Sequence, residues 1–398
     1  MTCAPHASAQ PARWGGVFAM TLCIFALIAS EFMPISLLTP MAADLHVTEG
    51  LAGSGVAVSG AFAVLASLSL ARLAGGMDRR TLLLGLTALM AVSGACVALA
   101  PNYAIYMLGR ALIGVVVGGF WSMSAATAMR LVPAWQVPRA LAIFNGGNAL
   151  ATVVAAPLGS WLGAVIGWRG AFLCLVPVAL TALAWQWFSL PSMRPQARAD
   201  VGGKIFAWLG RRTVALGMAA CGAFFMGQFA LFTYVRPFLE AVTHVDAPTL
   251  PLMLLVPGVA GFIGTLLIGG FLQRGLFRTL IAIPLLMAGI AVLLIAWGMS
   301  TAATAALLGL WGLVATAAPV GWWSWVTGTF GDNAEAGGGL MVAVVQCAIA
   351  LGSTMGGVLF DRGGHQSAFM ASAAVLLAAA LLAFLASRAQ AGGTPCTP

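Results

Sequence analysis

Apolar residues fill most of the chain in long runs that short polar stretches separate. A helix that crosses a bilayer needs about 20 consecutive, mostly apolar residues. Twelve runs of this length predict transmembrane helices at 16–39, 54–74, 82–100, 105–128, 140–166, 170–190, 214–240, 250–272, 279–299, 304–328, 338–360 and 365–387. The first run is too long, and too closely followed by others, for a cleaved signal peptide. We therefore expect an all-α polytopic membrane protein.

The composition agrees with this pattern, because 61% of the 398 residues are hydrophobic and only 7% are charged. Such a balance excludes a water-soluble globule. The net charge of +8 is spread over short loops, which indicates contact with lipid headgroups and argues against a nucleic-acid partner. The seven cysteines have no ligand-like or framework spacing. We expect no disulfide, metal or other cofactor.

The basic residues predict the orientation, since loops rich in Lys and Arg stay on the cytoplasmic side during insertion. Nearly all loop Lys and Arg residues fall on one side of the predicted helices, whereas Arg169 and Arg362 fall on the other. Both termini should therefore be cytoplasmic, in a bacterial inner membrane.

The longest break between predicted spans, residues 191–213, is rich in Pro, Gly and basic residues and lies at mid-chain. It predicts a cytoplasmic linker between two six-helix bundles, 1–190 and 214–398. Similar stretches support a repeat, since "GFWSMSAAT" at 119–127 resembles "GWWSWVTGT" at 321–329. Two halves with the same orientation are typical of a parallel membrane repeat.

The stretch "ARLAGGMDRRTLL" at 71–83 resembles the loop between the second and third helices of the major facilitator superfamily. Asp78, Arg79 and Arg80 match its acidic-basic core, but Ala74 replaces the usual glycine and the glycine between the basic residues is missing. The resemblance implies two bundles around a central cavity, with this loop as a cytoplasmic latch of the outward-facing state. The alternative is that these charges only enforce topology.

Two further motifs resemble those of proton-coupled members: "GRALIGVVVGG" at 109–119, and "APLGSWLG" at 156–163, where Pro157, Gly159 and Gly163 match an antiporter signature. At minimum, the small residues of the second motif indicate a helix that packs closely against a neighbour. The longer stretches "EFMPISLLTPMAADL" at 31–45, "GGFWSMSAATAMRLVP" at 118–133, "GQFALFTYVRP" at 227–237 and "PVGWWSW" at 319–325 resemble bacterial purine ribonucleoside efflux pumps. This resemblance implies proton-driven export of nucleosides such as inosine.

Glu31, Arg110 and Arg236 are charged residues inside apolar spans, where a charge is costly and by default marks a transport pathway. By helical rise, Glu31 and Arg110 can meet in one layer below the periplasmic surface. We hypothesise that Glu31 is the coupling acid and that Arg110 modulates its proton affinity. The alternative is a static buried ion pair. Arg236, beside Pro237 and one turn before Glu240, is a possible gate with Glu240 as its partner, or it only snorkels.

A nucleoside is neutral, flat at its base and rich in hydroxyls, so amides and aromatic faces should bind it. Asn145, Asn148, Gln228 and Gln346 are the amides nearest to mid-span, and Asn148 and Gln346 correspond in the repeat. Trp121 and Trp323 also correspond and are candidates for cavity lining. Interhelical hydrogen bonds and interfacial anchoring are the alternatives.

The leading interpretation is a monomeric secondary active transporter, not an enzyme, that exchanges a small organic solute for protons. No phosphate loop, dinucleotide fingerprint or serine-centred elbow occurs in a plausible setting. Export of sugars or hydrophobic drugs is the first alternative, and a non-transporting membrane sensor or scaffold is the second.

Overall fold

A computed structural model describes residues 12–73, 76–193, 208, 210–331 and 334–391, and these residues form helices without strands. The helices are α1 (Trp14–Ser36), α2 (Leu38–Asp44), α3 (Glu49–Leu73), α4 (Arg79–Ala98), α5 (Tyr103–Leu131), η1 (Ala134–Gln136), α6 (Val137–Leu173), α7 (Leu175–Ser189), α9 (Arg212–Phe232), α10 (Val235–Ala241), α11 (Leu250–Arg274), α12 (Leu276–Trp297), α13 (Thr301–Ala315), α14 (Ala318–Phe330) and α15 (Ala334–Ala391). The predicted all-α class is confirmed.

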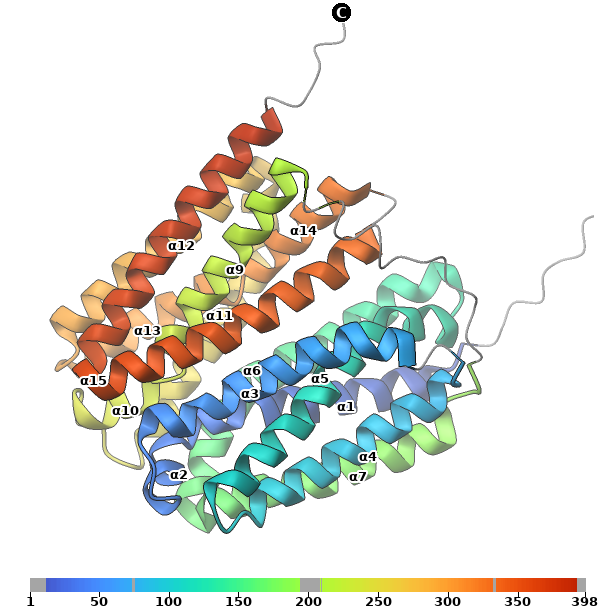
Figure 1. The fold of residues 1–398 in the computed structure, drawn as a ribbon, viewed down its shortest axis with the longest axis horizontal. Helices are drawn as coiled ribbons and strands as arrows, with labels where there is room; N and C mark the ends of the chain where they lie inside the picture. The colour runs from blue at the N-terminus through green and yellow to red at the C-terminus, as the bar shows by residue number, and fades with distance from the viewer. Residues whose placement is uncertain (1–11, 74–75, 194–207, 209, 332–333, 392–398) are drawn as a thin grey trace, which may run out of the picture.

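Ten stretches of the described chain are long and apolar enough to cross a membrane. Two of them, of 51 and 54 residues, are more than twice the length that a bilayer requires. α6 is interrupted at Gly167, and α15 at Gly363 and Gly364. Gly167 and Gly364 have φ of 75° and 66°, a region that glycine adopts without steric cost. Figure 1 shows the α15 ribbon turning back on itself, so each of these stretches contains two helices.

Three of the predicted spans are divided into two helices each. α1 and α2 separate at Leu37, α9 and α10 at residues 233–234, and α13 and α14 at residues 316–317. Pro237 and Pro319 lie in the first turns of α10 and α14, where a missing N–H removes no helical hydrogen bond. A break therefore precedes Pro237 inside the predicted span 214–240, and another divides the predicted span 304–328.

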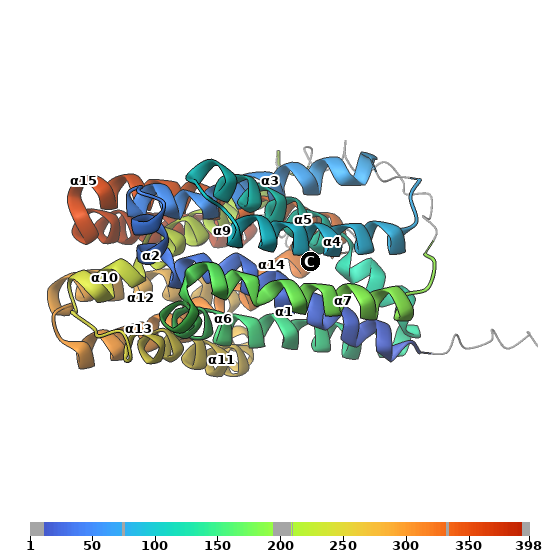
Figure 2. The same ribbon diagram turned by 90° about the horizontal axis from the view of Figure 1, so that it is seen from below.

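The helices before residue 190 and those after residue 211 occupy different sides of the molecule (Figure 1). Their buried apolar side chains fall mainly into separate clusters, one drawn largely from residues 214–383 and two from residues 17–193. α3 packs against α15 and α6 against α11, and these two helix pairs make the most extensive contacts between the halves. The halves converge at the end that carries α2 and α10 and diverge at the opposite end (Figure 1). Figure 2 also shows α2 and α10 at the same end of the molecule. Most of the predicted linker, 191–213, lies outside the described residues.

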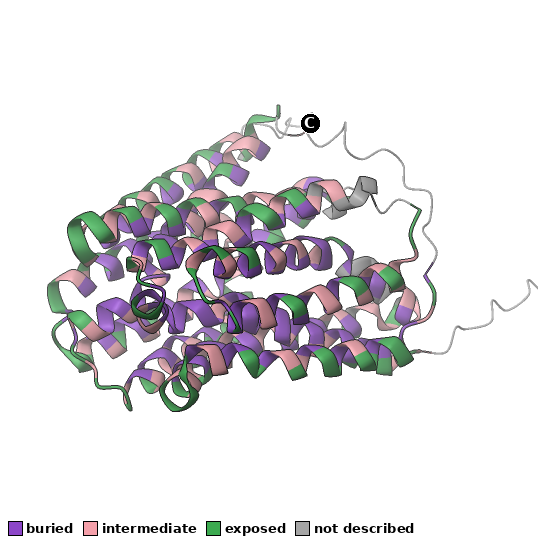
Figure 3. Ribbon diagram, turned by 60° about the horizontal axis from the view of Figure 1, so that its bottom comes forward, coloured by how far each residue is buried: buried purple, intermediate pink, exposed green. Residues whose placement is uncertain are grey.

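Exposed positions follow the outer faces of the helices, while buried ones line their contacts (Figure 3). Many of the exposed side chains are large and apolar, among them Leu65, Val165, Leu266 and Leu286. Soluble monomers rarely expose apolar patches larger than a few hundred Å². Together with the ten apolar stretches, this surface indicates a multi-pass membrane protein.

Candidate functional site

Arg110 on α5 is completely buried and joins three helices through backbone carbonyls. Pro34 lies inside α1 and has no N–H, so the carbonyl of Ser30 loses its usual helical donor. Arg110 Nη1 donates to this Ser30 oxygen over 2.9 Å, and Nε donates to the Gly55 carbonyl of α3 over 3.1 Å. Nη2 lies 3.5 Å from the carbonyl oxygen of Glu31. The guanidinium therefore supplies the donor that Pro34 cannot.

The structure brings Glu31 and Arg110 together, as the depth of the two residues predicted. Their contact differs from a facing ion pair, however, because within the described residues no ion pair joins the carboxylate of Glu31 to Arg110. The reason is that Pro34 leaves the Ser30 carbonyl without a helical donor, and the guanidinium donates to this oxygen. The positive charge still acts electrostatically on the Glu31 carboxyl group.

The Glu31 carboxyl group lies where the two halves of the chain meet. Glu31 and Gln346 of α15 are each only 8% exposed, and the Gln346 side chain lies against the carboxyl group. Gly60 of α3 packs on the Gln346 backbone, since a Cβ at Gly60 would lie 2.7 Å from the Gln346 oxygen. Beside Glu31, the rings of Phe32 and Phe229 stand 6.1 Å apart. Helices α1, α3, α9 and α15 thus meet around one acid.

Two of the predicted amides present unused acceptors. Gln346 Oε1 and Gln228 Oε1 of α9 are buried and have no hydrogen-bond partner among the described residues. A buried acceptor without a donor costs about 1–3 kcal/mol. Both oxygens are therefore suited to a ligand that carries N–H or O–H groups.

The other predicted substrate residues are less enclosed. Asn145 is exposed and Asn148 half-buried on α6, Trp121 is half-buried on α5, and Trp323 is exposed on α14. Asn148 corresponds to Gln346 in the repeat, and the Gln346 side chain lies against Glu31. The cavity-lining roles of these four residues remain predictions.

The predicted packing motif on α6 lies against α1. A Cβ at Gly159 would stand 2.6 Å from Ser36 Oγ and 3.1 Å from Met33 Cγ, and Gly163 faces Leu37 in the same way. Pro157 lies inside the helix one turn earlier. Small residues at these positions let α6 and α1 approach each other closely.

Arg236 forms the predicted pair with Glu240. Its Nε donates to Glu240 Oε1 over 2.9 Å, one helical turn away on α10. Its Nη1 also donates to the carbonyl of Ser36, the last residue of α1. The arginine thus reaches from the second half of the chain to the first, and its gating role remains a prediction.

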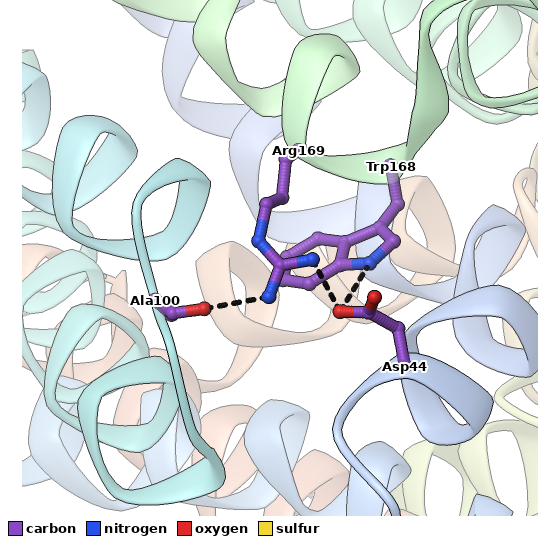
Figure 4. Close-up of polar contacts among 4 residues, drawn as sticks. All are labelled: Asp44, Ala100, Trp168 and Arg169. Carbon is purple, nitrogen blue, oxygen red and sulfur yellow. Dashed lines mark hydrogen bonds and ion pairs between the residues drawn. The ribbon is translucent and has the colours of Figure 1, made fainter.

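A second charged cluster at the same end stays within the first half (Figure 4). Arg169 donates to Asp44 of α2 and, over 2.8 Å, to the carbonyl of Ala100. Trp168 Nε1 donates to the same carboxylate over 3.3 Å, and the guanidinium lies 4.3 Å from the Trp168 ring. This cluster fixes α2 to the chain beyond α4 and to the turn at Gly167.

Asp78, Arg79 and Arg80 connect the start of α4 to the chain that follows α7. Asp78 accepts from Arg80 N over 2.9 Å as the N-cap of α4, from Met193 N over 2.7 Å, and from the Ser192 hydroxyl. Arg79 N donates to Met193 O over 3.1 Å. Arg80 Nη2 donates to the carbonyl of Trp187. These contacts lie within the first half, and the latch role predicted for the trio remains a prediction.

Burial works against ionisation of Asp78, but the hydrogen bonds from residues 192–193 and from Arg80 N hold the pKa of this carboxyl below its usual range. Asp78→Ala should lower the free energy of unfolding by about 1 kcal/mol, the usual cost of a lost N-cap. The contribution should be complete above the ordinary Asp pKa and disappear only as the pH falls through the lowered value.

Thermal unfolding of purified protein near neutral and at acidic pH measures this difference. Thr81→Ala, an exposed change in the same turn, is the control and should melt like the wild type. Equal midpoints for Asp78→Ala and wild type at neutral pH would contradict the capping role.

Comparison with known protein families bears directly on the fold. The family model described as Major Facilitator Superfamily matches residues 20–338, which is most of the chain. The chain belongs to the Major Facilitator Superfamily. This membership indicates a transporter rather than an enzyme.

Two curated relatives cover almost the full length. The "Transcription regulatory protein OpdE" of Pseudomonas aeruginosa is 66% identical over 385 residues, which are 96% of each chain. The "Purine ribonucleoside efflux pump NepI" of Salmonella enteritidis is 40% identical over 370 residues, which are 93% of each chain. The resemblance seen in the sequence is thereby confirmed as a relationship to efflux pumps of this kind.

Solved structures of Major Facilitator Superfamily transporters share the fold. A bacterial homologue of the human lysosomal transporter Spinster, in an inward-facing and unoccupied conformation, matches with a TM-score of 0.77 at 16% identity, over 98% of this chain and 100% of the other. A D-xylose-proton symporter also matches with 0.77, at 17% identity, over 93% and 97%. At these identities the likeness supports the architecture alone.

Proposed function

We propose that this superfamily member exports a small organic solute, specifically a purine ribonucleoside such as inosine, in exchange for protons across the bacterial inner membrane. The chain would cross the membrane twelve times, because two of the ten apolar stretches each hold two helices. Bundles 1–190 and 214–398, joined by linker 191–213, would alternate access as a monomer. With both termini cytoplasmic, the convergent end that carries α2 and α10 would be periplasmic, which corresponds to an inward-facing state (Figure 1).

Glu31 is the residue that we assign to proton coupling, and its position is the observation that carries the proposal. Its carboxyl group is buried between the halves, next to Gln346 and in the field of Arg110, but is not ion-paired within the described residues. An unpaired carboxylate in such a setting gains from binding a proton, whereas solvent or a polar ligand favours the ionised form. A rocking motion that changes the surroundings of Glu31 would therefore take up a proton on one side and release it on the other.

The unpaired acceptors support a hydroxyl-rich solute. Gln228 Oε1 and Gln346 Oε1 need donors, and ribose hydroxyls or purine N–H groups supply them. The 40% identity to a purine ribonucleoside efflux pump favours nucleosides over the sugars and hydrophobic drugs that are the alternative cargo. Trp121, Trp323, Asn145 and Asn148 remain proposed lining residues.

A second candidate function is supported by the other relative. Since the 66% identical protein is named a transcription regulatory protein, a membrane sensor or scaffold without transport is the competing proposal. Such a sensor would have no need of proton exchange, so solute-dependent proton flux separates the two functions.

A transport panel in inverted membrane vesicles tests the cargo. We expect inosine to collapse an imposed proton gradient in vesicles that contain the protein, while arabinose and chloramphenicol leave it at the level of vesicles without the protein. A response to arabinose or chloramphenicol alone would replace the nucleoside assignment, and no response to any solute would favour the sensor.

A further inference from the structure

Asp361 closes the N-terminus of a helix that belongs to the other half of the chain. It lies on α15 just before the turn at residues 363–364. Its Oδ1 accepts from Gly50 N over 2.9 Å, and its Oδ2 accepts from Thr48 Oγ1 over 2.6 Å. Thr48 directly precedes α3 and caps it, since its hydroxyl also accepts from Leu51 N over 3.1 Å. Asp361 thus adds a carboxylate cap to α3 from more than 300 residues away in sequence.

Gly50 makes this contact possible. A Cβ at this position would lie 2.6 Å from Asp361 Cγ and 2.6 Å from the Gly357 oxygen, closer than real Cβ contacts occur. Next along α3, Gly53 gives the same close approach to the Tyr234 ring, with a Cβ only 2.9 Å from its Cε1. Two glycines of α3 therefore let this helix meet the second half of the chain at the convergent end.

Arg236 makes the complementary contact at the end of α1, where it donates to the carbonyl of Ser36 while Glu240 holds its Nε. An anion is favourable at a helix N-terminus and a cation at a C-terminus. The second half of the chain thus caps two helices of the first half, each with the charge that the helix end prefers.

We propose that these two cross-half caps, Asp361 on α3 and Arg236 on α1, form a releasable latch that holds the α2/α10 end closed. Glu49 lies within the electrostatic reach of both Asp361 and Glu240, so like charges oppose closure and keep the latch weak enough to open. In the proposed transport cycle, this latch would define the state in which the α2/α10 end is closed. Only this assignment to a step of transport rests on the proposed function.

Spin labels at Ala43→Cys on α2 and Ala247→Cys after α10, in an otherwise cysteine-free protein, measure closure as a distance without solute or proton gradient. Both positions are exposed at this end, in opposite halves. Gly50→Ala and Asp361→Ala should each reduce the closed population relative to the open one about tenfold or more, the effect of losing hydrogen bonds to a charged acceptor. Gly50→Ala favours helix intrinsically, so it keeps the test valid if Asp361→Ala does not fold.

Asp361→Asn and Thr81→Ala are the comparison variants. Asparagine keeps one acceptor oxygen but loses the charge and the second acceptor, so Asp361→Asn should open this end more than wild type and less than Asp361→Ala. Thr81 is exposed at the start of α4, away from the latch, and Thr81→Ala should leave the distances unchanged. Unchanged distances in Gly50→Ala and Asp361→Ala, or equal opening in Thr81→Ala, would overturn the latch. None of these results depends on which solute is transported, so failure of the nucleoside assignment remains a separate outcome.

Discussion

Glu31→Gln is expected to abolish solute-driven proton movement while the protein still folds. Glutamine has nearly the same shape as glutamate and can still bond to Gln346, but it neither binds nor releases a proton. In inverted vesicles the inosine-dependent signal should fall to that of vesicles without the protein. Solute binding itself should persist, because the unpaired amide acceptors are unchanged.

Asp246→Asn is the control for this prediction, because Asp246 is an exposed carboxylate in the connection between α10 and α11. It should transport like the wild type. Wild-type proton movement in Glu31→Gln would remove Glu31 from the coupling mechanism and restore the view of a static buried group.

Arg110→Met is expected to lower the free energy of unfolding by about 2–5 kcal/mol. The change leaves the Ser30 carbonyl buried without a donor and removes the charged hydrogen bond to the Gly55 carbonyl, and each such loss costs about 1–3 kcal/mol. Thermal unfolding in detergent should show a clearly lower midpoint. Arg110→Lys should lie between, because one ammonium cannot reproduce the three guanidinium contacts.

Combining Arg110→Met with Pro34→Ala tests whether Arg110 compensates for the N–H that Pro34 lacks. Alanine returns an N–H to α1 that can reach the Ser30 carbonyl, so the cost of Arg110→Met should be smaller in the Pro34→Ala background. The double-mutant cycle should give a coupling energy of about 1 kcal/mol. Additive effects of the two changes would contradict the view that Arg110 compensates for Pro34.

The sequence predicted the helical class and most of the span positions, because bilayer-length apolar runs leave few alternatives. It also predicted that Glu31 and Arg110 share a layer and that Arg236 pairs with Glu240, since both follow from helical rise and spacing. Interruptions at Leu37 and at residues 316–317 were not predicted, because a hydropathy pattern does not register a local break inside an apolar run.

The sequence did not predict which groups the charged side chains contact. Arg110 binds carbonyl oxygens because Pro34 leaves one free, a signal visible in the sequence but meaningful only once α5 and α1 are known to touch. Asp361 was overlooked since its partners, Thr48 and Gly50, are remote in sequence. The repeat suggested that Asn148 and Gln346 bind one solute from the two halves, which stays a prediction, but it did not indicate that Gln346 also lies against Glu31.

Proton release from the purified protein in detergent, on addition of inosine, tests whether solute binding is coupled to a proton on Glu31. We expect release by wild type and none by Glu31→Gln, because the proton displaced by the solute comes from the Glu31 carboxyl group. A flat response from wild type across a series of nucleosides would contradict nucleoside-coupled proton exchange. Release of equal size from Glu31→Gln would contradict the assignment of the proton to Glu31.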